Sequence, residues 1–118
     1  MKRESALIQR SDWATEADQW VGRFEGGDYG TNVTILFFSS NTVGNGPSLH
    51  FHPYDEVFIV RQGRARFTVG GKIIDAEAGQ IVFGPANVPH KFENLGPGRL
   101  ETTDIHLNDR FIQTDLEE

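Results

Sequence analysis

Residues 44–63 have the sequence GNGPSLHFHPYDEVFIVRQG, which places three polar side chains in a stretch that otherwise resembles a core strand. Side chains alternate between the two faces of a strand, so His50 and His52 lie on one face and Glu56 keeps the same parity. Pro53 has no N–H to donate, which predicts a bulge or bend before Glu56. The spacing therefore directs two imidazoles and one carboxylate toward one point.

A fourth polar residue of the same kind, His90, follows the turn-rich segment PANVP and has to arrive from a different strand. An isolated buried charge is costly, whereas imidazoles and a carboxylate that converge on a divalent cation satisfy one another. A His-X-His pair alone is more typical of a solvated strand face, and Glu56 and His90 shift the balance toward a metal site. Because the chain has no cysteine, its metal ligands have to be His, Asp or Glu.

The rest of the chain predicts short strands, each closed by Gly, Pro or Asn. The apolar runs lie at 31–40, 56–60, 64–69, 72–76, 80–83, 90–94 and 99–107. The pair Gly70 and Gly71 has the form of a two-residue hairpin turn. The phenylalanines on these runs are predicted to fill the core: Phe38, Phe58, Phe67, Phe83 and Phe92. This pattern predicts an all-β sandwich or barrel at residues 30–118.

Residues 1–29 are more mixed, with Trp13 and Trp20 scattered among polar residues. We predict an N-terminal arm that packs on the barrel or on a dimer partner. No internal repeat or low-complexity tract interrupts the chain, whose length of 118 residues suits one domain with one core.

The histidines and Glu56, together with the glycines, proline and asparagines around them, resemble the two sequence motifs of the cupin superfamily. The first comprises Gly44, His50, His52, Glu56 and Gly63, and the second comprises Gly79, Pro85, Asn87, His90 and Asn94. Asn87 stands where the family usually has glycine. The replacement is mild, because Asn tolerates the left-handed backbone conformation better than most residues.

The resemblance implies a small single-domain cupin with a double-stranded β-helix, or jelly-roll, barrel that is often a homodimer. It implies one divalent transition metal, Fe, Mn, Ni, Cu or Zn, bound by His50, His52, Glu56 and His90. The family includes dioxygenases, isomerases and epimerases, decarboxylases, lyases and non-enzymatic binders, and the fold does not select among them.

Three further residues are candidate catalytic groups. The run at 99–107 alternates polar residues, among them Asp104 and His106, with apolar ones, and in an ordinary barrel the apolar set points inward. A polar, metal-bearing cavity reverses that expectation and would let Asp104 and His106 act as acid, base or substrate-orienting groups. Tyr54 shares the parity of the motif histidines, and we expect it at the rim of the site rather than as a catalytic phenol.

Composition limits the classes of partner. With 17 acidic against 11 basic residues the net charge is −6, which argues against nucleic acid as a partner. The chain has no apolar run of membrane-spanning length and no signal-peptide pattern at its start, so we expect a cytoplasmic protein without a membrane partner. We expect a metal-dependent enzyme acting on a small-molecule substrate, with dioxygenase chemistry placed first. A metal-dependent isomerase or epimerase and a non-catalytic metal-binding or small-molecule-binding cupin are the alternatives.

Overall fold

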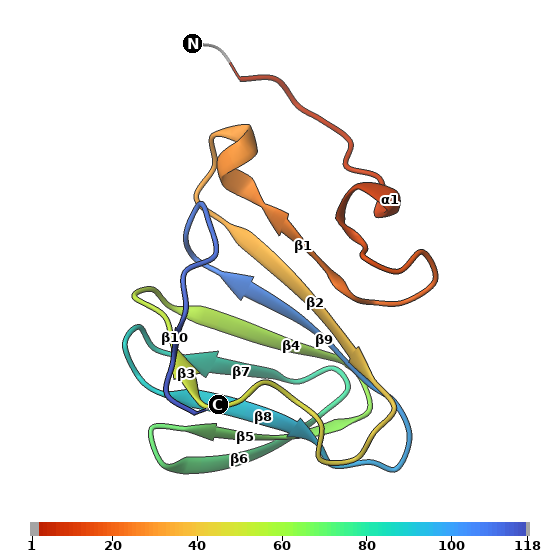
Figure 1. Cartoon of the computed structure of the whole chain (residues 1–118), viewed down its shortest axis with the longest axis vertical. Coiled ribbons are helices and arrows are strands. Elements are labelled where there is room, and N and C mark those ends of the chain that lie inside the picture. Colours follow the sequence, from red (N-terminus) through yellow and green to blue (C-terminus); the bar gives the residue numbers. More distant parts are fainter. Residues whose placement is uncertain (1–2, 118) are drawn as a thin grey trace.

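The protein folds into two five-stranded antiparallel sheets, seen in a computed structural model that describes residues 3–117 (Figure 1). The first sheet has the strand order β1-β2-β9-β4-β7. Its strands are β1 (Gly22–Glu25), β2 (Thr34–Ser40), β9 (Leu100–His106), β4 (Glu56–Gln62) and β7 (Ile81–Gly84). Two short helical segments, α1 (Arg10–Trp13) and η1 (Gly26–Tyr29), flank β1 in the sequence.

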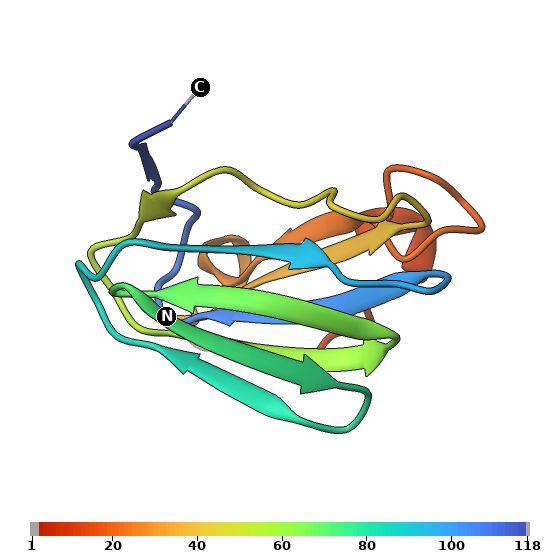
Figure 2. The same ribbon diagram turned by 90° about the horizontal axis from the view of Figure 1, so that it is seen from below.

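The second sheet has the order β10-β3-β8-β5-β6. Its strands are β10 (Thr114–Asp115), β3 (His50–Phe51), β8 (His90–Asn94), β5 (Arg64–Val69) and β6 (Lys72–Glu77). From β2 onward the chain passes repeatedly from one sheet to the other, and the two sheets lie as facing layers (Figure 2). This is the connectivity of a jelly roll, and the all-β expectation is confirmed.

Two left-handed turns lie where the sequence predicted them. Gly70 and Gly71 have φ values of 56° and 82° and join β5 to β6 in the conformation that a two-residue hairpin turn requires. Asn87 has φ of 65°, so it adopts the left-handed conformation for which its side chain is tolerated. Its N–H donates to the His52 carbonyl at 2.7 Å, which ties the turn before β8 to the segment after β3.

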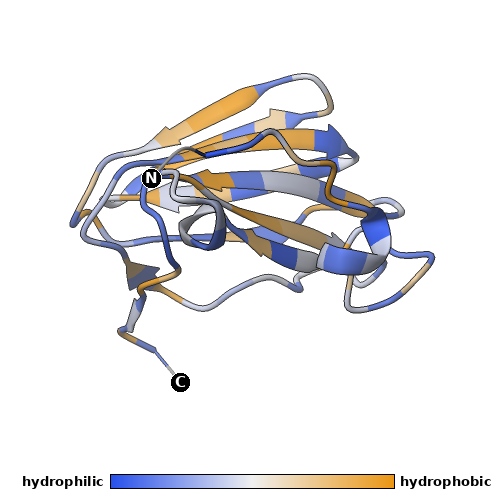
Figure 3. Cartoon of the chain, turned by 90° about the horizontal axis from the view of Figure 1, so that it is seen from above, coloured by the Kyte–Doolittle hydropathy of each residue, from blue (hydrophilic) through white to orange (hydrophobic). Residues whose placement is uncertain are grey.

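The hydrophobic core fills one part of the space between the sheets, around Phe58, Phe67 and Phe92. Apolar and polar residues alternate along the strands that surround it (Figure 3). Phe83 was wrongly predicted to join this core, because it lies on the opposite face of β7 from Val82 and is 55% exposed. Alternation along β7 therefore sends Val82 inward and Phe83 outward.

The N-terminal segment lies along one side of the first sheet of its own chain (Figure 1). The Trp13 ring stacks on Phe37 of β2 with centroids 3.8 Å apart, and the Trp20 indole donates to the Thr103 hydroxyl of β9 at 3.1 Å. Strand β1 pairs with β2, so part of the predicted arm is an edge strand of the sheet. The domain division itself stays a prediction.

Among residues 3–117, none of the helical segments has the length and apolar character needed to cross a membrane.

Candidate metal centre

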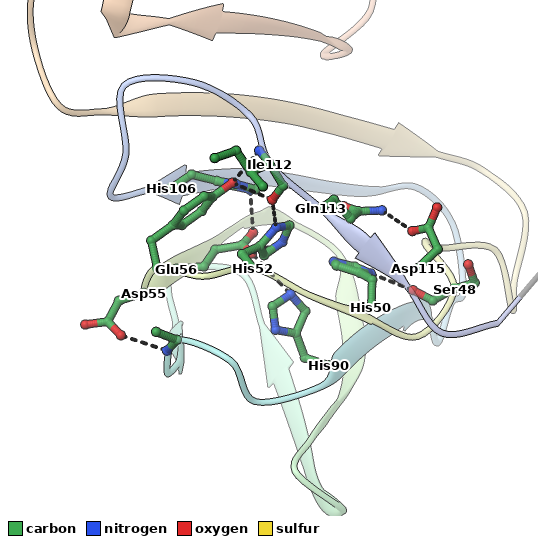
Figure 4. Close-up of polar contacts among 12 residues, drawn as sticks. Ser48, His50, His52, Asp55, Glu56, His90, His106, Ile112, Gln113 and Asp115 are labelled. Atoms are coloured by element: carbon green, nitrogen blue, oxygen red, sulfur yellow. Dashed lines mark hydrogen bonds and ion pairs between the residues drawn. The ribbon is translucent and has the colours of Figure 1, made fainter.

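The structure brings His50, His52, Glu56 and His90 together from both sheets. His50 begins β3 and pairs directly with His90, the first residue of β8, while Glu56 begins β4 in the other sheet. All four residues are only 2–4% exposed, and their candidate ligand atoms lie within 4.8 Å of one another. The side chains point toward a common centre (Figure 4).

Three polar atoms at this centre have no hydrogen-bond partner in the described residues. Glu56 Oε1 lies 3.1 Å from His52 Nε2 and 3.2 Å from His90 Nε2. None of these three buried atoms forms a hydrogen bond within residues 3–117. Unpaired polar atoms are costly in a protein interior, and one divalent cation would satisfy all three. The cluster is therefore suited to a metal ion.

Two main-chain carbonyls orient the imidazoles. The His50 ring contacts the Ser48 carbonyl through Nδ1 at 2.6 Å, and the His52 ring contacts the Ile112 carbonyl through Nδ1 at 2.7 Å. A carbonyl only accepts, so each Nδ1 carries the proton and donates it. The lone pair of each ring is then on Nε2, as metal ligation requires.

The protonation states at the centre also suit a cation. Burial lowers the pKa of His50, which favours the neutral imidazole that binds metals. Burial alone would raise the pKa of Glu56, but its contacts with His106, His52 and His90 outweigh burial and lower it. His50 is therefore biased toward its neutral form and Glu56 toward its ionised form.

His106 points inward, beside Glu56. Its Nε2 lies 3.0 Å from Glu56 Oε2, and it is 1% exposed. The face of β9 that carries Thr102, Asp104 and His106 is buried, whereas Ile105 on the other face is half-buried and Leu107, just after the strand, is exposed. The ordinary inside-apolar pattern is thus reversed, as a polar cavity requires.

Tyr54 is buried behind His106, not at the rim as predicted, with 8% exposure. Its hydroxyl lies 2.7 Å from His106 Nδ1 and accepts a hydrogen bond from the Ile112 N–H at 3.2 Å. Burial raises the pKa of Tyr54 and lowers the pKa of His106, so a phenol faces a neutral imidazole. The hydroxyl has one proton, and the Ile112 carbonyl, at 3.1 Å, is a second acceptor within its reach. Because His106 Nε2 faces the Glu56 carboxylate at 3.0 Å, the ring proton is favoured on Nε2, which leaves Nδ1 to accept from Tyr54.

Asp104 is the third candidate catalytic residue, and it lies on the same buried face of β9. It is 5% exposed, and its Oδ1 forms no hydrogen bond within the described part of the chain. Burial and the nearby Glu56 carboxylate raise the pKa of Asp104 well above its ordinary value. Asp104 is therefore biased toward its protonated form.

The centre opens into a cavity of about 580 Å³. His50, His52, Glu56, Asp104 and His106 line one part of the cavity. Apolar side chains form much of the remaining wall, including Leu36, Phe38, Pro47, Phe58 and Phe92. The metal-binding group therefore faces a space large enough for a small molecule.

Sequence reasoning missed the contribution of the C-terminal segment. The Ile112 carbonyl accepts from His52 Nδ1 and lies 3.1 Å from the Tyr54 hydroxyl, to which the Ile112 N–H donates. Phe111, the preceding residue, packs against His52 and His106 with ring centroids 5.9 and 5.7 Å apart. A main-chain group leaves no residue-type signal, so no sequence pattern could have indicated Ile112.

Comparison with known proteins agrees with this fold. Residues 41–106 match the family model described as cupin domain, and both clusters of motif residues lie inside the match. The chain belongs to the cupin domain family. The fold expected from the two motifs is confirmed.

Relatives of this cupin cover it only in part. The uncharacterized protein SCO3923 of Streptomyces coelicolor is 43% identical over 64 residues, which are 54% of this chain and 60% of that protein. A structure of Bacillus subtilis oxalate decarboxylase at pH 4.6 matches with a TM-score of 0.72 at 22% identity. Another, described for the Mn(II) centers of that enzyme, matches with a TM-score of 0.71 at 22% identity. Each of the two covers 80% of this chain and 27% of the longer enzyme chain, so the likeness is one of fold.

Proposed function

We propose that this cupin is a metal-dependent enzyme that acts on a small organic molecule. His50, His52, Glu56 and His90 would hold one divalent transition metal, and the substrate would occupy the adjoining cavity. The observation that carries this proposal is that three of the four buried donors, His50, His52 and Glu56, line a cavity of about 580 Å³. A purely structural metal site is normally closed by its protein ligands, whereas a catalytic one keeps positions open.

A bound metal would supply a Lewis acid for substrate oxygens and, as Fe(II), a centre for dioxygen chemistry. The chain itself supplies orientation and the exclusion of water. The Ser48 and Ile112 carbonyls fix the ring tautomers, and His106 contacts the outer oxygen of Glu56. The apolar walls around Phe38 and Phe92 keep the reacting groups away from bulk water.

We place dioxygenase chemistry first among the possible reactions. His106 Nδ1 lies 2.7 Å from the Tyr54 hydroxyl, and Nε2 lies 3.0 Å from Glu56 although it forms no hydrogen bond within the described residues. Both ring nitrogens therefore face protein groups, so this histidine is poorly placed to take a proton from substrate. That weakens the isomerase hypothesis in which His106 is the base. An apolar cavity also suits dioxygen and apolar substrates.

An isomerase or epimerase is the second candidate, and the observation in its favour is Asp104. Asp104 lines the cavity, its Oδ1 has no hydrogen-bond partner in the described residues, and a carboxyl with a raised pKa is suited to proton transfer near neutral pH. The two candidates differ in whether turnover consumes dioxygen.

The test is to reconstitute the protein separately with Fe(II), Mn(II), Ni(II) and Zn(II) and to measure metal retention, oxygen uptake and product formation. Manganese is included because an oxalate decarboxylase of similar fold is described with Mn(II) centers. The substrate panel consists of small aromatic and aliphatic carbonyl compounds. His90→Ala removes one donor, and Lys91→Ala, at the next position of β8, is the matched control.

The proposal predicts metal-dependent turnover that His90→Ala abolishes and Lys91→Ala preserves. Oxygen uptake would select the dioxygenase, and turnover without it would select the isomerase. A wild-type protein that retains none of the four metals would contradict the proposal and favour a cupin whose histidines bind an organic ligand directly.

A further inference from the structure

Asp104 is a buried carboxyl group that contacts Thr102 and has one oxygen, Oδ1, without a hydrogen-bond partner in the described residues. Its side chain projects from β9 into the cavity, and Leu36 of β2 and Phe58 of β4 are its cross-strand neighbours. Oδ1 forms no hydrogen bond within residues 3–117. Since most buried polar atoms in proteins are satisfied, such a group facing a cavity indicates a missing ligand.

The protonation state of Asp104 determines which kind of ligand atom it would bind. Burial, and then the charge of Glu56, raise the pKa of Asp104 well above its ordinary value and favour the neutral carboxyl. A neutral carboxyl has one O–H to donate. The complementary group on a ligand is a hydrogen-bond acceptor such as a carbonyl oxygen.

The side chains around Asp104 indicate the polarity of the rest of the ligand. The inner wall beside it carries Leu36, Phe38, Phe58 and Phe92, which offer only apolar surface. The other polar lining residues outside the metal-binding group and His106 are exposed or half-buried: Thr15, Arg23, Asn45 and Gln113. A ligand that reaches Asp104 therefore has an apolar body and few polar atoms.

We propose that Asp104 is the substrate-positioning residue of this cupin, donating a hydrogen bond to the carbonyl oxygen of a small, mainly apolar or aromatic ketone, aldehyde or carboxylic acid. The inference rests on the proposed function in taking the cavity as the substrate site. It adds the substrate class and the residue that selects it.

The test compares acetophenone with ethylbenzene, which have similar shape but differ in the acceptor oxygen. Dissociation constants are measured by ligand-observed NMR on the full chain as purified, in preparations of equal measured metal content. Asp104→Leu removes the donor and keeps the branched shape of the side chain, whereas Asp104→Asn keeps an N–H donor. Asp75→Asn, at an exposed aspartate on β6, is the control for loss of a carboxylate.

We expect the wild type to bind acetophenone more tightly than ethylbenzene, although ethylbenzene is the more apolar probe. Asp104→Leu should weaken acetophenone binding about five- to tenfold, the usual contribution of one hydrogen bond, and leave ethylbenzene within about twofold. Asp104→Asn and Asp75→Asn should stay within about threefold of the wild type for both probes.

Equal affinity of the wild type for the two probes would overturn the inference, and this comparison needs no variant to fold. Unchanged acetophenone binding by a folded Asp104→Leu would overturn it as well. A different result would reject the proposed function while leaving this inference intact. Absence of bound metal or turnover, with probe binding still dependent on Asp104, would reject the enzyme and keep the carbonyl site.

Discussion

Tyr54 positions His106 through a single hydroxyl group. Replacing it by phenylalanine keeps the ring that stacks on His52, with centroids 5.1 Å apart, but removes the partner of His106 Nδ1. The His106 proton is then free to move from Nε2 to Nδ1, which would leave Glu56 without its donor. Because such outer contacts tune ligand groups, we expect Tyr54→Phe to weaken metal affinity by about tenfold.

Competition with a chromophoric chelator measures this affinity. Tyr29→Phe, at a tyrosine that is 43% exposed, is the control and should behave as the wild type. Identical metal affinity for Tyr54→Phe and the wild type would show that the hydroxyl does not orient the site.

Asp104 should make the stability of the protein depend on pH. Its pKa is raised in the folded state, so above about pH 4 the unfolded chain releases this proton while the folded chain retains it. The contribution of Asp104 to stability is therefore lost as pH rises from there toward its folded pKa. Asp104→Asn avoids that loss and should raise the Tm by about 4 °C or more at pH 8, with little gain at pH 4.

Thermal unfolding at pH 4, 6 and 8 tests this sign. Asp75 pairs with Arg66, which lowers its pKa, so Asp75→Asn should show no gain that grows with pH. A gain for Asp104→Asn that is equal at all three pH values would mean that folding does not raise the pKa of Asp104.

At the scale of elements, the turn between β7 and β8 depends on Asn87. Its φ of 65° suits glycine and asparagine, and its N–H holds the His52 carbonyl. Asn87→Gly should be nearly neutral, and Asn87→Val should destabilise the fold by about 1–2 kcal/mol, the cost of a left-handed residue with a bulky side chain. Urea unfolding measures both, and equal midpoints for the two variants would contradict the role of the backbone conformation.

The strands around the metal centre that could be predicted from the sequence are those whose residues follow a regular alternation or end at a clear turn. Alternation placed His50 and His52 on one face, and the turn residues marked the ends of β5 through β8. The orientation of β9 could not be settled in advance, because its inward face is polar and Ile105 suggested the opposite. The short strands β3 and β10 each have two residues, too few for a periodic signal.

At the scale of the whole molecule, one apolar surface crosses β7, β4 and β9. Ile81 and Phe83 are 64% and 55% exposed, and they pair with Ile59 and Val57 of β4. Exposed apolar surface that spans several strands is typical of an interface. We propose that the expected homodimer forms through this surface, with a second copy presenting the same face.

Light scattering coupled to size-exclusion chromatography tests the dimer. Phe83→Asp should give a monomer, because it places a charge in the middle of the interface, whereas Ile73→Asp, at an equally exposed position on β6, should leave the dimer intact. A wild-type monomer at high micromolar concentration would contradict the proposal.

The candidate metal centre borders the hydrophobic core, where Phe58 packs edge-on against His90 with ring centroids 5.2 Å apart. The core cluster around Phe58, Phe67 and Leu100 contains none of the four donor residues. The fold should therefore survive loss of the metal, and His52→Ala should lose its metal while keeping a cooperative unfolding transition.

The most direct test of the account is the metal content of untagged wild-type protein, His52→Ala and His90→Ala, purified without chelator and measured by elemental analysis beside thermal unfolding. The account predicts close to one transition metal ion per wild-type chain and almost none in either variant, with all three proteins folded. Wild-type protein that binds no metal even after reconstitution with Fe, Mn, Ni and Zn would contradict it.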